Sequence, residues 1–300
     1  MKKFILSALI MLLTVSIMAA DSKYLSRQEL EKLNITLTYP QWKLKALTFS
    51  YDDGNIADRQ LVAIFNKYGM KATFHIPSNW LKDPKRSANR VKEEEINQLY
   101  AGHEVSGHGC KHVTLILVKP ERIAKELDGD INEWQRITGK KLLGYAYPFG
   151  RYNDTVVKVV KEKGLIYARV AKPAESFDLT EDFLRWRPHA HHKRKINKLG
   201  EEYLNFVPKR MSLLMIWGHS YEFEKAKNWH QIENFCKLMT NKPEIFYATM
   251  GEIAHYAMAT SQLTLSADGK SIKNNALRPV FFLYDNKKIE LAPNAVFNLK

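Results

Sequence analysis

The sequence predicts an α/β fold in which a parallel sheet closes into a barrel. Apolar strand segments alternate with amphipathic helix patterns through the middle of the 300-residue chain, and this alternation is typical of parallel sheets covered by helices. Polar residues suited to catalysis directly follow several different strands. In a barrel those strand ends meet on one face, whereas an open doubly wound sheet gathers its ligands near one switch point. The barrel is therefore the better prediction.

The predicted elements follow one another in a regular order, with most helices ending at a glycine. Leu61, Ile64 and Phe65 recur at helical spacing before Gly69, and Pro120 suits the first turn of the longest helix. Strands are predicted at residues 44–49, 72–76, 103–106, 142–147, 165–170, 212–217 and 244–248. Further helices are predicted near residues 93–100, 120–134, 154–163, 229–239 and 251–259.

The pattern changes at about Ser261. Short runs of strand-forming residues at 263–265, 280–284 and 288–291 are separated by turn sequences rich in Asp, Asn, Gly and Lys. Residues 261–300 are therefore predicted to form a small antiparallel β appendage, and we expect it to cap the barrel.

The first 20 residues have the pattern of a signal peptide. Lys2 and Lys3 precede an almost wholly apolar run, and Ala19 and Ala20 provide small residues for cleavage. A single membrane anchor is the alternative, but the run is shorter than the roughly 20 residues that span a bilayer. We expect residues 1–20 to be removed on export to the periplasm or the extracellular space. Residues 21–260 then form the main domain, with no membrane span after signal removal.

The chain is strongly basic, with a formal net charge of +14. A basic exported protein suits an anionic polymer or a membrane surface, and charge spread over lysine-rich helix faces for solubility is an equal alternative. Neither common glycine-rich phosphate loop is present, and no nucleic-acid partner is expected. The two cysteines, Cys110 and Cys236, could form one disulfide, but two cysteines are too few for a fold held together by disulfides.

Two blocks carry the chemistry. Asp52 and Asp53 end an apolar strand and precede Gly54, and His108 and His112 follow another strand with a spacing of four. One carboxylate and two imidazoles form a three-ligand, open site for a divalent metal, for which zinc is suitable and cobalt, nickel or iron are alternatives. The second carboxylate is left for proton transfer. The combination indicates metal-assisted hydrolysis.

Together these blocks resemble the polysaccharide deacetylases, which form carbohydrate esterase family 4 and share the NodB-homology domain. The family motif T-F-D-D-G is matched by Thr48-Phe49 and, after two further residues, by Asp52-Asp53-Gly54; the H-(S/T)-x-x-H motif is matched by His108 and His112. The R-P-P-Y-G motif is matched only at residues 148–150, and the motif that ends in histidine is matched at residues 217–219. The resemblance implies an irregular (β/α)7-type barrel.

The resemblance also implies a role for each matching residue. Asp53, His108 and His112 would bind the metal, and Asp52 would be the general base. His219 would be the general acid, and the backbone N–H of Phe149 would donate to the oxyanion. Trp217 would form a wall of the acetyl pocket. The remaining expected substrate-binding residues are Tyr147, Pro148 and Trp186.

Two segments depart from the family pattern. The position of the arginine that orients the catalytic aspartate holds Ala146, and we expect Arg169 to reach Asp52 from a neighbouring strand; an ordinary surface cation is the alternative. The segment 182–192 replaces the fourth family motif. We interpret its histidines as a groove wall or a polar loop rather than a second metal site, because no carboxylate lies at ligand spacing nearby: His189, His191 and His192.

The sequence thus predicts an exported, metal-dependent deacetylase that acts on a carbohydrate polymer. N-acetylglucosamine-containing or anionic polymers are the expected partners. An esterase of the acetylxylan type and a catalytically inactive glycan-binding protein are the alternatives; Ala146 favours the inactive protein, and the intact ligand set argues against it.

Overall fold

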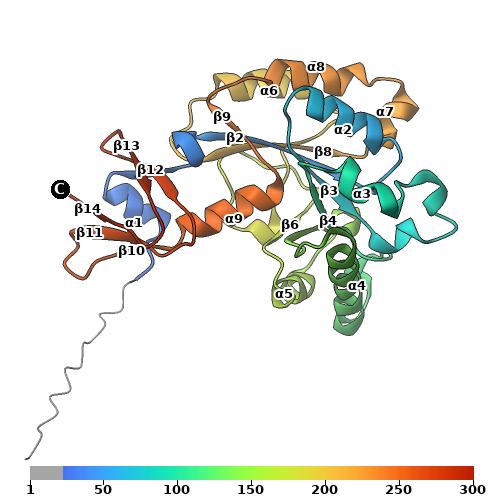
Figure 1. Cartoon of the computed structure of the whole chain (residues 1–300), viewed down its shortest axis with the longest axis horizontal. Coiled ribbons are helices and arrows are strands. Elements are labelled where there is room, and N and C mark those ends of the chain that lie inside the picture. The colour runs from blue at the N-terminus through green and yellow to red at the C-terminus, as the bar shows by residue number, and fades with distance from the viewer. Residues whose placement is uncertain (1–22) are drawn as a thin grey trace, which may run out of the picture.

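The computed structural model describes residues 23–300, so the predicted signal peptide at residues 1–20 lies outside the described part. A curled parallel sheet is surrounded by helices, and a small β module is attached at one end (Figure 1). The predicted α/β barrel with antiparallel C-terminal strands is confirmed. Within residues 23–300, no helix combines the length and apolar character needed to cross a membrane.

The main sheet contains eight parallel strands, seven of them in the order β6-β5-β4-β3-β2-β8-β7. β9 pairs with the first half of β2, and β3 pairs with the second half. Trp186 pairs with Arg169 on β6, and the following β7 pairs with β8, so this segment joins the two edges of the sheet and closes the barrel. The strands are β2 (Lys45–Asp52), β3 (Ala72–Ile76), β4 (Glu104–Gly107), β5 (Gly144–Ala146), β6 (Tyr167–Arg169), β7 (Ala190–His191), β8 (Ser212–Gly218) and β9 (Ile245–Tyr247).

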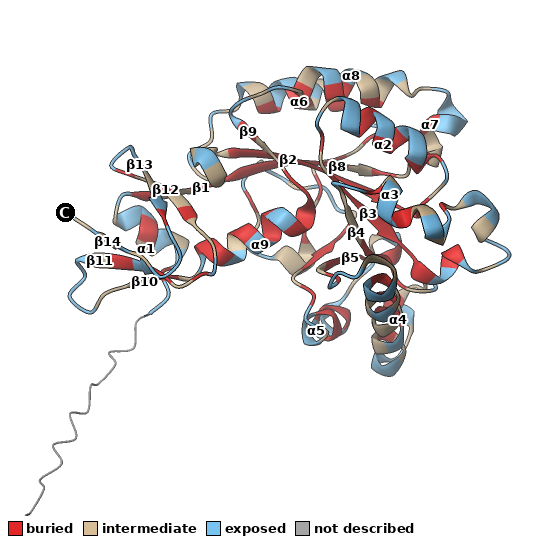
Figure 2. Ribbon diagram, in the orientation of Figure 1, coloured by how far each residue is buried: buried red, intermediate tan, exposed pale blue. Residues whose placement is uncertain are grey.

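Amphipathic helices cover the outside of the sheet. α2, α6 and α8 lie along one flank and α4 and α5 along the other (Figure 1), and their buried stripes face the strands (Figure 2). Asn153 caps α5 by accepting a hydrogen bond from the N–H of Val156, at 2.9 Å. The helices are α2 (Asp58–Lys67), α3 (Ile96–Leu99), α4 (Pro120–Thr138), α5 (Asp154–Glu162), α6 (Ile196–Asn205), α7 (Tyr221–Ala226), α8 (His230–Met239) and α9 (Met250–Thr260).

Helix α9 closes the barrel at the amino-terminal ends of the strands. The N–H of Met250 donates to Thr73 Oγ1 at 2.9 Å, and the N–H of Gly251 donates to Glu104 Oε2 at 2.8 Å. A Cβ atom at position 251 would lie 2.4 Å from the Glu104 carboxylate, so only glycine allows this close approach. The opposite end, where the strands finish, remains for the functional site.

The appended module combines both ends of the described chain. β1 pairs antiparallel with β12, and the N–H of Leu25 donates to the carbonyl of Leu263 at 2.9 Å. The module is therefore larger than the expected residues 261–300, because α1 and β1 share its apolar core. Its elements are α1 (Arg27–Lys32), β1 (Ile35–Thr38), β10 (Leu263–Leu265), β11 (Ser271–Asn274), β12 (Val280–Tyr284), β13 (Lys287–Leu291) and β14 (Val296–Asn298).

Candidate active site

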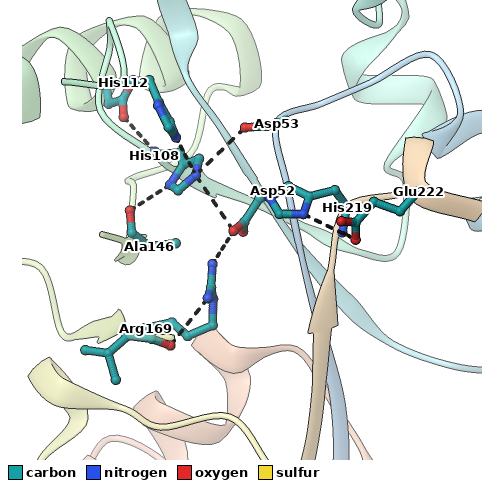
Figure 3. Close-up of polar contacts among 10 residues, drawn as sticks. Asp52, Asp53, His108, His112, Ala146, Arg169, His219 and Glu222 are labelled. Atoms are coloured by element: carbon teal, nitrogen blue, oxygen red, sulfur yellow. Dashed lines mark hydrogen bonds and ion pairs between the residues drawn. The ribbon is translucent and has the colours of Figure 1, made fainter. Parts of the chain in front are cut away.

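The residues predicted as metal ligands, general base and general acid meet at the carboxyl ends of the parallel strands (Figure 3). Asp52 is the last residue of β2, His108 directly follows β4, and His219 directly follows β8. Asp53 and His112 occupy tight backbone positions with φ of 81° and 56°, in the left-handed region that non-glycine residues rarely adopt. Such conformations often mark functional sites, since the surrounding structure must hold them in place.

Asp53, His108 and His112 form a cluster with metal-ligand geometry. One donor atom from each lies within 4.8 Å of the others, and His108 Nε2 is 3.2 Å from His112 Nε2 and 3.9 Å from Asp53 Oδ1. Asp53 Oδ1 is buried and has no hydrogen-bond partner among residues 23–300. An orphaned carboxylate oxygen beside two converging imidazoles fits a divalent cation, for which these are normal ligands.

The surroundings of His108 set the tautomer that a metal ligand needs. His108 Nδ1 lies 2.8 Å from the carbonyl oxygen of Ala146, which can only accept, so the proton is on Nδ1 and the Nε2 lone pair faces Asp53 and His112. Burial lowers the pKa of His108 to about 3, which keeps the ring neutral. Both features favour metal binding.

The loop that carries His108 is anchored by Asp130 from α4. Asp130 accepts hydrogen bonds from the N–H of His108 at 2.8 Å and the N–H of Ser78 at 3.0 Å. Burial raises the pKa of Asp130 to about 7. The sequence analysis missed this residue, which appears only as a polar position on the inner face of an amphipathic helix.

Arg169 forms a buried ion pair with Asp52 Oδ2, and the two side chains are only 1% and 3% exposed. Arg169 on β6 lies directly opposite Ala146 on β5, so the cation reaches the aspartate from the adjacent strand. The guanidinium also lies 4.6 Å from the centre of the Trp217 ring. Burial opposes ionisation of Asp52, but the charge of Arg169 and the nearby imidazoles hold its pKa below the usual range.

Glu222 on α7 contacts three histidines and a lysine beside the site. Its Oε2 atom lies 3.4 Å from His219 Nδ1, 3.1 Å from His191 Nε2 and 3.2 Å from His192 Nε2, and its Oε1 atom lies 2.6 Å from Lys193 Nζ. Burial opposes the charged form of His219, but Glu222 and the aspartates raise its pKa above the usual value. Its three partners on the 191–193 segment are distant from Glu222 in sequence.

The residues expected to bind substrate divide into two groups. Phe149 has a φ of 60°, is 62% exposed and packs its ring 4.6 Å from that of His112, while Trp217 is partly buried. Tyr147 and Trp186 are 0% and 1% exposed, and the Tyr147 hydroxyl donates to a backbone carbonyl, that of Leu184, at 2.9 Å. These two rings support the site from the core, because no surface of either is open to a sugar. Pro148 is buried as well.

The match to known proteins falls on this part of the chain. Residues 41–168 match the family model of the polysaccharide deacetylases, and this stretch contains the whole Asp53 cluster. Over these residues the chain is similar to the polysaccharide deacetylase family. The resemblance inferred from the motifs is confirmed.

Individual relatives are distant. A peptidoglycan deacetylase from Helicobacter pylori is 25% identical over 114 residues, which are 38% of this chain and 36% of the relative. A peptidoglycan-N-acetylmuramic acid deacetylase from Bacillus subtilis is 26% identical over 125 residues, which are 41% of this chain and 45% of the relative. The chain therefore spans less than half the length of these curated relatives.

The barrel fold is shared with a solved structure. A structure from Mycobacterium smegmatis that is assigned to the polysaccharide deacetylases superimposes with a TM-score of 0.57 at 16% identity, covering 75% of this chain and 93% of that chain. At this identity the likeness supports the barrel fold alone.

Proposed function

We propose that this protein is a metal-dependent hydrolase that removes acetyl groups, primarily N-acetyl groups, from a carbohydrate polymer outside the cytoplasm. One observation carries the proposal: the Asp53 cluster lies beside Asp52, a buried carboxylate held by Arg169. A ligand set and a separate, oriented base in one site are what metal-assisted hydrolysis requires. The names of the relatives favour peptidoglycan as the first substrate to test.

Asp53, His108 and His112 would hold the metal. When bound there, a divalent ion supplies a Lewis acid that acidifies water and polarises the acetyl carbonyl. Zinc suits one carboxylate and two imidazoles, and cobalt, nickel and iron accept a similar set.

The chain's own groups divide the proton transfers between two sides of the site. Asp52 takes a proton from the attacking water, whose oxygen bonds to the acetyl carbon. His219 gives a proton to the sugar nitrogen as the carbon–nitrogen bond breaks, which releases acetate and the free amine. The N–H of Phe149 donates to the oxyanion, a contact worth roughly 2.7–4 kcal/mol in other hydrolases. The raised pKa of His219 favours the protonated form that this role needs.

The decisive experiment combines metal analysis with acetate release. The purified protein is tested on peptidoglycan, on N-acetylglucosamine oligomers and on acetylated xylan, with Asp53→Ala as the control. We expect one bound metal equivalent and acetate release from an N-acetylated glycan. Metal binding without acetate release from any glycan would instead support an inactive glycan-binding protein, and release from xylan alone would identify an esterase.

A further inference from the structure

A basic cavity of about 790 Å³ adjoins the proposed metal site. Asp53 lines it together with Arg86, Arg90, Trp80 and Tyr221, and the lining also contains Lys225 and one further carboxylate, that of Glu224. Neither Arg86 nor Arg90 takes part in the proposed hydrolysis, so the mechanism gives no role to the positive charges in this cavity.

Trp80 connects the two arginines to the metal ligands. The guanidinium carbons of Arg86 and Arg90 lie 4.6 Å and 4.7 Å from the centre of the Trp80 ring. The same ring, which is only 6% exposed, lies 5.0 Å from the His112 ring. A group bound by the arginines is therefore separated from the metal site by a single side chain.

The backbone holds Arg90 against the loop that carries Asp53. Asn55 and Arg90 form an antiparallel bridge, and the N–H of Val91 donates to the carbonyl of Gly54 at 3.0 Å. Arg90 and Asp53 therefore lie on two backbone segments that are hydrogen-bonded to each other.

Neither of these two arginines forms a direct ion pair within residues 23–300, although the charges of Asp53 and Asp58 act on Arg90 from a greater distance. Among residues 23–300, no carboxylate oxygen lies within 4.0 Å of a nitrogen of Arg86 or Arg90. By contrast, Arg59 in the same cavity forms a two-pronged pair with Glu95, at 3.0 Å and 2.8 Å. Two guanidinium groups on one ring repel each other, and an anion between or beside them relieves that repulsion. Planar guanidinium forks match carboxylate and phosphate oxygens.

We propose that Arg86 and Arg90 bind an anionic group, a carboxylate or a phosphate, on a sugar next to the acetylated one. The substrate class is then an anionic glycan, and its negative charge places the acetyl group at the metal site. This inference rests on the proposed deacetylase function for its placement of the substrate, but charge recognition can be measured without turnover.

The test compares matched oligosaccharides in binding and in turnover. Three N-acetylated tetrasaccharides of equal length are used: a neutral one, one with carboxylate-bearing sugars and one with a phosphate monoester. Binding is measured calorimetrically on the metal-loaded Asp52→Asn variant, and initial rates are measured on the unmodified protein. We expect at least one charged oligomer to bind about tenfold tighter than the neutral one, as for a gained charged hydrogen bond, and the arm that does so identifies the anion.

Three substitutions test whether Arg86 and Arg90 cause the preference for the charged oligomer. Arg86→Gln and Arg90→Gln together should abolish the preference for the charged oligomer by raising its KM. Arg59→Gln is the matched control, because that arginine is already paired, and it should leave the preference intact. Raising the salt concentration should weaken binding of the charged oligomer alone, which tests the idea even if the double variant folds poorly.

Equal binding of neutral and charged oligomers, or a preference that survives in a folded double variant, would overturn the inference. Its failure is distinguishable from failure of the proposed function. A charge preference without acetate release leaves the anion site standing and removes the hydrolase, whereas acetate release without charge preference does the reverse.

Discussion

Two clusters in this protein have the same composition but different chemistry. Each has two imidazoles and one carboxylate with donor atoms within 4.8 Å: Asp53, His108 and His112 in the first, and His191, His192 and Glu222 in the second. Composition and proximity would assign a metal to both, so the hydrogen bonds around them must decide.

In the first cluster a backbone carbonyl fixes the ring proton of His108 on the nitrogen that faces away from the other two ligands. His108 Nδ1 donates to the Ala146 carbonyl, which leaves the Nε2 lone pair free. In the second cluster the direction is reversed. The N–H of Lys193 donates to His191 Nδ1 at 3.2 Å, so the proton of a neutral ring is on Nε2 and points to Glu222. The lysine ammonium also pairs with Glu222, whose negative charge is therefore compensated.

The comparison teaches that the outer hydrogen bonds of a histidine separate a metal ligand from a hydrogen-bond donor. We interpret the Asp53 cluster as the metal site and the Glu222 cluster as an ion-paired network that holds His219. The predictions below test this distinction in order of decreasing effect.

The largest effect is expected for metal content. Asp53→Ala should reduce bound metal from one equivalent to nearly zero and abolish acetate release, because a ligand is lost. Glu222→Ala should retain the full equivalent. Elemental analysis of the two purified variants makes the measurement. Two equivalents in the unmodified protein, with one lost in Glu222→Ala, would contradict the comparison.

The next effect separates the two adjacent aspartates. Asp52→Asn should keep the metal but lower turnover by about 10²–10⁴-fold, because only the general base is removed. Metal content and acetate release are measured on the same sample. Equal metal loss in Asp52→Asn and Asp53→Ala would mean that both carboxylates are ligands.

Removal of Arg169 should affect both stability and pH dependence. Arg169→Met leaves a buried carboxylate without its cation, at a cost of about 3–5 kcal/mol in the free energy of unfolding. Losing the cation raises the Asp52 pKa, so the base becomes protonated at a higher pH and the acid limb of the rate profile moves upward. Urea unfolding and a pH–rate profile test the two parts.

Arg187→Met is the control for that variant. Arg187 pairs with Glu175 on the surface at 2.8 Å, and its loss should cost about 0–1 kcal/mol with no change in the pH profile. A profile that does not move in Arg169→Met would assign Arg169 a structural role alone.

The smallest effect is expected for Glu222→Gln. This change removes the charge that holds His219 and should lower turnover of amides by about tenfold, with a smaller loss on activated esters, whose leaving groups need little protonation. His219→Ala should show the same contrast with a larger loss. The neighbouring Glu224, whose carboxylate accepts from Trp229 Nε1 at 3.1 Å, provides Glu224→Gln as the matched control. Equal losses on amides and esters would indicate a structural role for the network.

The sequence alone determined the barrel and the residues of the Asp53 cluster. Strand and helix periodicity are local patterns, and so is the placement of Asp52, Asp53 and His108 directly after apolar runs. Because parallel strands end on the same face, local order was enough to predict which side chains meet. The same reasoning led to Arg169, whose strand was expected beside that of Ala146.

Only the tertiary structure decided what surrounds that cluster. Asp130 supports His108 from a helix, and Glu222 meets three residues about 30 positions earlier in the chain; neither contact leaves a periodic pattern in the sequence. Burial decided the place of Tyr147 and Trp186, because an aromatic side chain near a motif suits a groove and a core equally well. Spacing along one strand is local, whereas pairing and burial depend on every element that packs around a residue.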